Sequence, residues 1–176
     1  MDQAFTKVSS TLLSFFDSQA LMAALELKIF DAMRKPATTS EICSACGIPE
    51  TSGKRLLIAL NAMGFLTRDN ENYGIEPSLT AYLLSDSPTW MGWLSRHSNR
   101  FLYPLWNHTA AAISEDKNQR ETAWNDDRSW FDILYSQEQD VVDCQSFLSI
   151  LAAPFIAGVV ENYDFAKHKG VSAIVY

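Results

Sequence analysis

Residues 38–66 read TTSEICSACGIPETSGKRLLIALNAMGFL, and this stretch decides the fold. The hydroxyl residues before Glu41 predict the cap of a short helix that ends at Gly47. Ile48-Pro49-Glu50 then begins a second helix, which carries apolar residues at helical spacing until Gly64 stops it. The stretch therefore predicts two consecutive helices joined by a tight turn.

The residues on either side of this stretch extend the pattern. Residues 65–68 and 73–75 read as the two strands of a small hairpin around a polar turn. Upstream, helices are expected over 3–16 and over 18–34, the second of them capped by Ser18. Helices followed by a hairpin in this order form the winged-helix arrangement, which is a variant of the helix-turn-helix.

Helical patterns dominate the rest of the chain. We expect helices over 77–84, over 87–113 with a kink or interruption at Pro104, over 130–135, and over 137–161 with a kink or boundary at Pro154. Residues 114–129 are polar and predict a connection. The fold class is therefore mainly α, with a winged-helix module over 1–84, a helical region over 85–169 and a single buried strand over 170–176.

Composition limits the classes of function. Of 176 residues, 47% are apolar and 20% are charged, which is ordinary for a soluble globular protein, while aromatic residues reach 12%. The formal net charge of −7 disfavours general binding to nucleic-acid backbones. The three cysteines lack the spacing of a disulfide framework, which favours a reducing, cytoplasmic setting. We find no signal peptide and no apolar run approaching ~18 residues, so we expect a soluble protein with no membrane partner.

The winged-helix order raises the hypothesis of a DNA-binding regulator. The candidate recognition helix over 49–63 carries only Lys54 and Arg55 as cations, and residues 1–84 hold seven Lys and Arg against nine Asp and Glu. A groove-reading domain shows a basic face. A packing and dimerisation module is therefore the favoured interpretation, and no nucleic-acid partner is expected.

Residues that could carry chemistry are sparse. Cys43 and Cys46 have the spacing of a metal or redox pair, but no second pair or nearby histidine completes four zinc ligands, so no metal site is predicted. Among the histidines, His108 is the best placed to face a pocket, because it follows Pro104 by one turn in an aromatic segment. No G-x-G occurs for a nucleotide-like cofactor, so we assign no catalytic and no cofactor-binding residue.

The order of several motifs resembles small-molecule S-adenosylmethionine-dependent O-methyltransferases. Residues 18–31, SQALMAALELKIFD, resemble the opening helix of that family. Thr39-Ser40-Glu41-Ile42 followed by Gly47-Ile48 resembles its T-x-x-E-I/L-A…G stretch, and residues 55–66 resemble the helix and wing that come next. Residues 160–165, VENYDF, resemble the segment before the first Rossmann strand. Each motif is short, but together they cover nearly the whole chain.

The resemblance implies the N-terminal half of such an enzyme, a winged-helix dimerisation region with a substrate lid and without the Rossmann catalytic half. It implies that these residues face a small-molecule pocket: Phe101, Tyr103, Trp106, His108, Phe147 and Leu148. For the dimer interface we predict Leu12, Phe15, Phe16 and Leu21. The apolar face of 3–16 fits either packing on its own domain or an arm that packs on a partner. S-Adenosylmethionine is expected only on a partner or on a missing half.

Four functions fit these observations. The first is a truncated methyltransferase-like subunit of secondary metabolism, inactive alone, that forms a homodimer or a heterodimer with a fuller methyltransferase and helps to form its substrate pocket. The second is one piece of a complete O-methyltransferase. The third is a methyltransferase-like fold for S-adenosylmethionine-independent pericyclic or rearrangement chemistry, with polar groups such as His108 or Arg96. The fourth and least favoured is the DNA-binding regulator.

Overall fold

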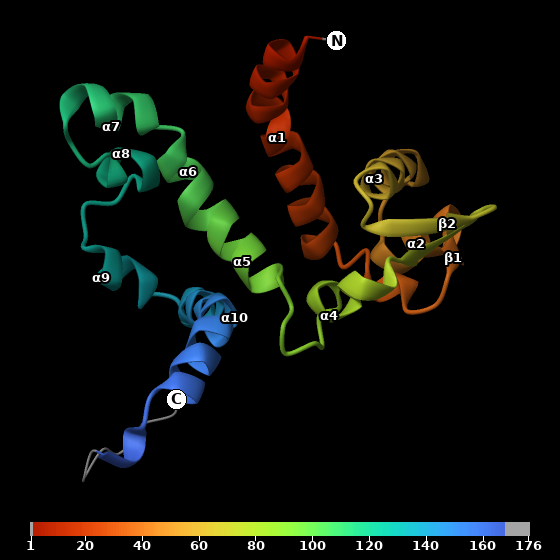
Figure 1. The fold of residues 1–176 in the computed structure, drawn as a ribbon. Coiled ribbons are helices and arrows are strands. Elements are labelled where there is room, and N and C mark those ends of the chain that lie inside the picture. The colour runs from red at the N-terminus through yellow and green to blue at the C-terminus, as the bar shows by residue number, and fades with distance from the viewer. Residues whose placement is uncertain (1, 168–176) are drawn as a thin grey trace.

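The computed structural model describes residues 2–167, and the protein is mainly helical (Figure 1). The first part of the chain contains, in order, α1 (Gln3–Glu26), η1 (Asp31–Met33), β1 (Ala37–Thr38), α2 (Thr39–Cys46), α3 (Glu50–Ala62), β2 (Leu66–Asp69), β3 (Asn72–Ile75), η2 (Pro77–Leu79) and α4 (Thr80–Leu83). The second part contains α5 (Gly92–His97), η3 (Ser98–Leu102), α6 (Tyr103–Trp106), α7 (Thr109–Glu115), α8 (Arg120–Trp124), α9 (Trp130–Leu134), α10 (Glu138–Asn162) and η4 (Phe165–Lys167). The mainly α class is confirmed, and the strand predicted over 170–176 lies outside the described residues.

The N-terminal apolar pattern forms one helix rather than two. α1 continues through Ser18, whose hydroxyl donates to the Ser14 carbonyl at 3.4 Å instead of capping a new helix. The cap is Asp2, whose carboxylate accepts a hydrogen bond from the Ala4 N–H at 2.9 Å. The two predicted helices are therefore a single continuous one.

This helix also ends earlier than its apolar pattern predicts. α1 stops at Glu26, and Lys28 adopts a left-handed φ of 56°, which does not occur inside an α-helix. The chain then turns so that Ile29 and Phe30 are buried in the core. The predicted helix over 18–34 is thus wrong at both ends, because apolar spacing reports burial and not the continuity of the backbone.

The stretch over residues 38–66 forms α2 and α3 as predicted. The Thr38 hydroxyl accepts a hydrogen bond from the Glu41 N–H at 3.3 Å, and the Glu41 carboxylate accepts one from the Thr38 N–H at 2.7 Å. These two bonds complete a capping box. Hydrogen bonding, first from the Thr38 backbone and then from its hydroxyl, lowers the pKa of Glu41. Gly47 ends α2 with a φ of 65°, where a side chain would be strained.

A small antiparallel sheet completes the first part of the protein. β2 and β3 pair with Leu66 opposite Ile75, which confirms the predicted hairpin. β1, which the sequence does not predict, pairs with β3 and places Ala37 opposite Tyr73, so the strand order is β1-β3-β2. The helices and this sheet share one core, whose largest fully buried side chains are Phe30, Ile29, Ile42, Leu57 and Leu60.

The helical path from Gly92 to Trp106 contains a π-helical turn, η3. Pro104 lacks an N–H, and in a regular α-helix its ring would collide with the carbonyl four residues earlier. In the structure the Tyr103 N–H donates to the Ser98 carbonyl, five residues back, so a wider turn precedes the proline. The interruption predicted at Pro104 therefore takes the form of one widened turn followed by α6.

Two later segments differ from their sequence predictions. The polar connection predicted over 114–129 contains α8, because Trp124 at the end of that helix packs into a hydrophobic cluster instead of standing in solvent. No helix boundary falls at Pro154, since α10 continues through it to Asn162. A single proline removes one hydrogen bond from a helix, and the remaining bonds of this long helix hold it together.

α10 has the predicted length but is more apolar than the sequence patterns indicate. By length and composition alone, Glu138–Asn162 is a helix that could cross a membrane, contrary to the expectation that no such stretch exists. The beginning of the same helix buries Asp140 and Asp143 against other helices. The apolar character is therefore concentrated in its second half, where Phe155 and Val160 are exposed.

We expect Gly53→Ala to destabilise the protein by about 1–3 kcal/mol, because a Cβ at this position would overlap the Cys43 Sγ where α3 lies against α2. Gly158→Ala is the matched control. Gly158 lies inside α10 with open space around its Cβ position, so alanine should raise stability by about 0.5–1 kcal/mol. Chemical denaturation followed by circular dichroism measures both changes, and an undiminished stability of Gly53→Ala would contradict the close packing.

Candidate functional site

Aromatic rings gather where α5 and η3 meet α8, α9 and α10. The aromatic cluster consists of His97, Phe101, Trp124, Trp130 and Phe147. The Phe101 ring lies 4.9 Å from that of Trp130 and 5.6 Å from that of Trp124, centroid to centroid, and both contacts are edge-on. The Trp124 Nε1–H donates to the Phe101 carbonyl at 3.0 Å. The cluster thus joins four segments that are distant in sequence.

His97 is the polar member of the aromatic cluster and is 5% exposed. Its ring centroid lies 4.6 Å from that of Phe147, 5.2 Å from that of Phe101 and 5.9 Å from that of Trp130. The Nδ1 atom of His97 is buried and has no hydrogen-bond partner among the described residues. The arrangement places one polar atom among aromatic rings.

Burial favours the neutral form of the His97 imidazole and lowers its pKa, while the carboxylates of Asp143 and Asp140 act in the opposite direction. An unpaired buried polar atom costs about 1–3 kcal/mol of stability, and native proteins pair nearly all such atoms. Two described side-chain atoms are exceptions, His97 Nδ1 and Arg120 Nε. His97 is the one that lies among aromatic rings, which makes it a candidate ligand-binding residue through Nδ1.

Two of the six predicted pocket residues lie together in the structure, and the other four lie outside the aromatic cluster. Phe101 and Phe147 both lie against His97 in the aromatic cluster. The other four lie elsewhere: Tyr103 and His108 are half-buried, on α6 and directly before α7, and Trp106 and Leu148 are exposed. The pocket role of all six residues stays a prediction.

Sequence patterns favoured His108 as the histidine that faces a pocket, and not His97. His97 precedes Phe101 by four residues, which places both on one helical face, and this spacing was the available signal. The contacts with Phe147 and Trp130 could not be read from the sequence, because they depend on how α10 and α9 fold back on α5.

The predicted interface residues lie on α1, whose N-terminal half extends away from the rest of the protein (Figure 1). Leu12, Phe15 and Phe16 are 69%, 47% and 56% exposed. Leu21 is half-buried and lines an apolar groove of about 480 Å³ between α1, α4, α5 and α10. Their place in an interface stays a prediction.

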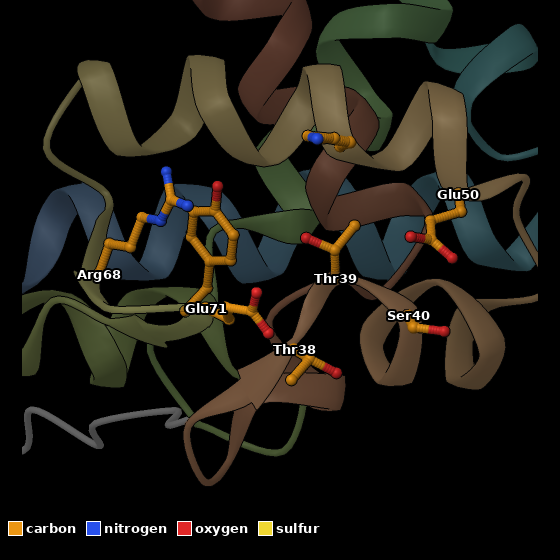
Figure 2. Close-up of a pocket in the computed structure, with 8 residues that line it drawn as sticks. Thr38, Thr39, Ser40, Glu50, Arg68 and Glu71 are labelled. Atoms are coloured by element: carbon orange, nitrogen blue, oxygen red, sulfur yellow. The ribbon is translucent and has the colours of Figure 1, made fainter.

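A polar hollow of about 330 Å³ lies between the hairpin and the beginnings of α2 and α3 (Figure 2). Arg68 and Glu71 come from the hairpin, and Glu50 and Lys54 come from α3. The Arg68 guanidinium lies over the Tyr73 ring, 5.3 Å from its centroid. Because carboxylates stand beside both cations, this hollow lacks the basic face that a nucleic-acid backbone requires.

The residues that could ligate a metal do not gather in the described part of the chain. Within residues 2–167, no group of three or more His, Cys, Asp or Glu could hold a metal ion. Cys43 and Cys46 are free, and burial raises the pKa of both thiols, so neither is an activated thiolate. The sheet in this range is antiparallel, unlike the parallel sheets whose strand ends hold nucleotide-like cofactors. We therefore assign no cofactor contact to these residues.

Comparison with known proteins identifies one domain of the chain. Residues 9–85 match the O-methyltransferase dimerisation domain. The chain is 45% identical over 159 residues to the S-adenosyl-L-methionine-dependent methyl transferase PigF of Serratia sp. (strain ATCC 39006). That alignment covers 90% of this chain and 46% of PigF.

Solved structures extend the likeness past the dimerisation domain. PigF with SAH has a TM-score of 0.89 and 46% identity, over 96% of this chain and 50% of PigF. Human N-acetylserotonin methyltransferase in complex with SAM has a TM-score of 0.83 at 23% identity, over 94% of this chain and 50% of that enzyme, and shows the fold alone. The chain spans about half the length of these relatives. The predicted likeness to the half that contains the dimerisation domain is confirmed.

We expect His97→Phe to leave stability at pH 7 unchanged or to raise it by up to about 2 kcal/mol, because it removes the unpaired nitrogen and keeps an aromatic ring. The sign of the pH effect follows from the lowered pKa. As the pH falls through the unfolded value of about 6.5, the unfolded chain takes up the proton first, so stability falls by at most about 1.4 kcal/mol per pH unit.

Urea denaturation at pH 7 and at pH 5.5 measures this effect. The His97→Phe variant should lose less stability between the two pH values than the wild-type chain does. Equal losses in both proteins would contradict a buried, neutral His97.

Proposed function

We propose that this chain is a methyltransferase-like subunit that dimerises through its N-terminal region, with itself or with a fuller methyltransferase, and contributes part of the wall of a small-molecule pocket. The observation that carries the proposal is the unpartnered Nδ1 of His97 inside the aromatic cluster. Aromatic walls with a few oriented polar groups are typical of small-molecule sites. The family resemblance implies a pocket role for Phe101 and Phe147, whose ring centroids lie 5.2 and 4.6 Å from that of His97.

The chemistry of the aromatic cluster suits a planar aromatic substrate with a hydroxyl or N–H donor. A neutral imidazole offers a hydrogen-bond acceptor, and the surrounding rings make edge and face contacts with flat molecules. S-Adenosylmethionine, held by the partner or by the rest of the enzyme, supplies the methyl group when bound. In this proposal His97 binds and orients the substrate, and the protein works in the cytoplasm of its host.

The exposed face of α1 supports the dimer. Of the 24 residues of α1, the buried ones are Ala24 and Leu25, both close to its end. The exposed apolar residues Phe5, Leu12 and Phe16 recur at helical spacing on the projecting half of the helix. A continuous apolar stripe of this kind marks a contact surface, and it lies partly within the segment that matches the dimerisation domain.

We expect Phe15→Asp combined with Phe16→Asp to dissociate the dimer, because two charges cannot be desolvated in an apolar contact without partners. Phe131→Asp is the matched control, since Phe131 on α9 is 62% exposed and lies outside the α1 stripe. Analytical ultracentrifugation should show a mass close to 19.8 kDa for the double variant and twice that for the control. A double variant that still sediments as a dimer would show that α1 is not the interface.

The pocket is tested with a pair of probes that differ by one methyl group. 2-Naphthol donates a hydrogen bond and 2-methoxynaphthalene does not, so we expect the wild-type chain to bind 2-naphthol more tightly. His97→Phe should weaken binding of 2-naphthol by about tenfold and leave binding of the ether unchanged, which is the scale of one lost hydrogen bond. Titration followed by NMR measures both affinities. Equal affinity of the wild-type chain for the two probes would contradict the proposal that His97 accepts a hydrogen bond from the ligand.

A further inference from the structure

The buried face of α10 is unusual in its chemistry. Its buried residues are Asp140, Asp143, Cys144 and Phe147, so two of the side chains that α10 packs against its neighbours are carboxylates. The side chains of Asp143 and Asp140 are 4% and 9% exposed. Burial of a carboxylate requires a partner, and this requirement restricts which residues can lie opposite α10.

Two arginines from α5 and η3 meet these carboxylates. Arg96 Nε donates to both oxygens of Asp143, at 2.9 and 3.1 Å, and the Gln139 amide adds a bond to the same carboxylate at 2.8 Å. Arg100 Nε donates to Asp140 Oδ2 at 2.6 Å. The earlier arginine pairs with the later aspartate, so the two segments run in opposite directions where they meet.

This double pairing fixes one register between the segments. A slide of α10 by one turn would move Asp143 away from Arg96 and leave at least one buried carboxylate without its cation. Leaving a buried carboxylate without its cation is costly, whereas an apolar contact between two helices tolerates a slide because its contacts are not directional. The ion pairs thus exclude the neighbouring registers.

The register of α10 matters because Phe147 and His97 lie close to the Asp143–Arg96 pair in sequence. Phe147 follows Asp143 by four residues, on the same face of α10, and His97 directly follows Arg96. We propose that Asp143 is a positioning residue of the pocket: paired with Arg96, it sets the register in which α10 lays the Phe147 ring against His97. The proposal rests on the proposed function of the aromatic cluster and names a residue that determines its geometry.

Cation–π contacts support the same geometry. The Arg96 guanidinium lies 5.0 Å from the centroid of the Trp90 ring, and that of Arg100 lies 5.1 Å from the centroid of Phe101. Each arginine is therefore held on two sides, by a carboxylate and by a ring. The charged groups around His97 are Arg96 and Arg100 on its own segment and Asp140 and Asp143 on α10.

The decisive variant removes both partners of one pair. In Arg96→Met with Asp143→Leu, the contact between α5 and α10 is apolar. The chain should stay folded, because the buried carboxylate is removed together with its partly exposed cation. The His97 imidazole resonances should lose the ring-current shift imposed by Phe147. The affinity for 2-naphthol should fall at least fivefold, although neither substituted residue belongs to the aromatic cluster.

NMR spectra of the 176-residue chain provide the readout, and its three histidines make assignment simple. Asp143→Asn is the single variant, and Asp126→Asn is the control. Asp126 pairs with Arg128, two residues away, and not with a residue of α5, η3 or α10. We expect shifted His97 resonances in Asp143→Asn and wild-type resonances in the control. If Asp143→Asn fails to fold, as its circular dichroism would show, the double variant decides the matter.

A folded double variant with wild-type His97 resonances and wild-type 2-naphthol affinity would overturn the proposal, because Asp143 would then be structural only. Failure of the proposed function looks different. If the wild-type chain does not bind 2-naphthol, the proposed pocket is wrong. The His97 resonances would still report whether Asp143 sets the position of Phe147.

Discussion

Desolvation of two carboxylates governs how the second part of this protein is built. Asp140 and Asp143 leave water when α10 packs, and each must find a cation as it does so. Arg96 and Arg100 supply these cations from a short helical path that also carries His97 and Phe101. The ion pairs and the ring contacts therefore depend on the same packing of α10, and the aromatic cluster forms only where both carboxylates have their cations.

The two parts of the protein are stabilised in different ways. The first part has a mainly aliphatic core, in which Ile42 and Leu57 are completely buried. Two left-handed glycines and a capping box add local stability to its helix ends. The second part has a small core of rings, leaves a polar atom of His97 unpaired and exposes apolar residues such as Phe155 along α10. Sites for ligands and partners commonly sacrifice stability in this way.

Local signals explain why much of the first part was predictable. The cap before Glu41 and the stop at Gly47 act within four residues, so the sequence alone determines α2. The division of α1 failed because a serine in a continuous helical pattern can satisfy its hydroxyl on the preceding turn, as Ser18 does. β1 was missed because two residues carry no periodicity and pair only once β3 is in place.

The candidate site was less predictable, because it is made by segments that are distant in sequence. Phe101 and Phe147 were selected through family resemblance, and nothing in their spacing shows that His97 lies against both. The sequence favoured His108 because it shares an aromatic segment with Trp106, yet Trp106 is 70% exposed. Burial of an imidazole depends on the packing of α9 and α10, which local patterns do not report.

The widened turn at Ser98–Leu102 has a consequence for the length of the chain at this point. It accommodates one residue more than an α-helical turn would, between His97, which faces Phe147, and Tyr103, the first residue of α6. Loss of a single codon here would leave Pro104 against a regular α-helical turn, in which its ring collides with the carbonyl four residues earlier. We therefore expect the segment to tolerate exchange of side chains better than a shortening of its backbone.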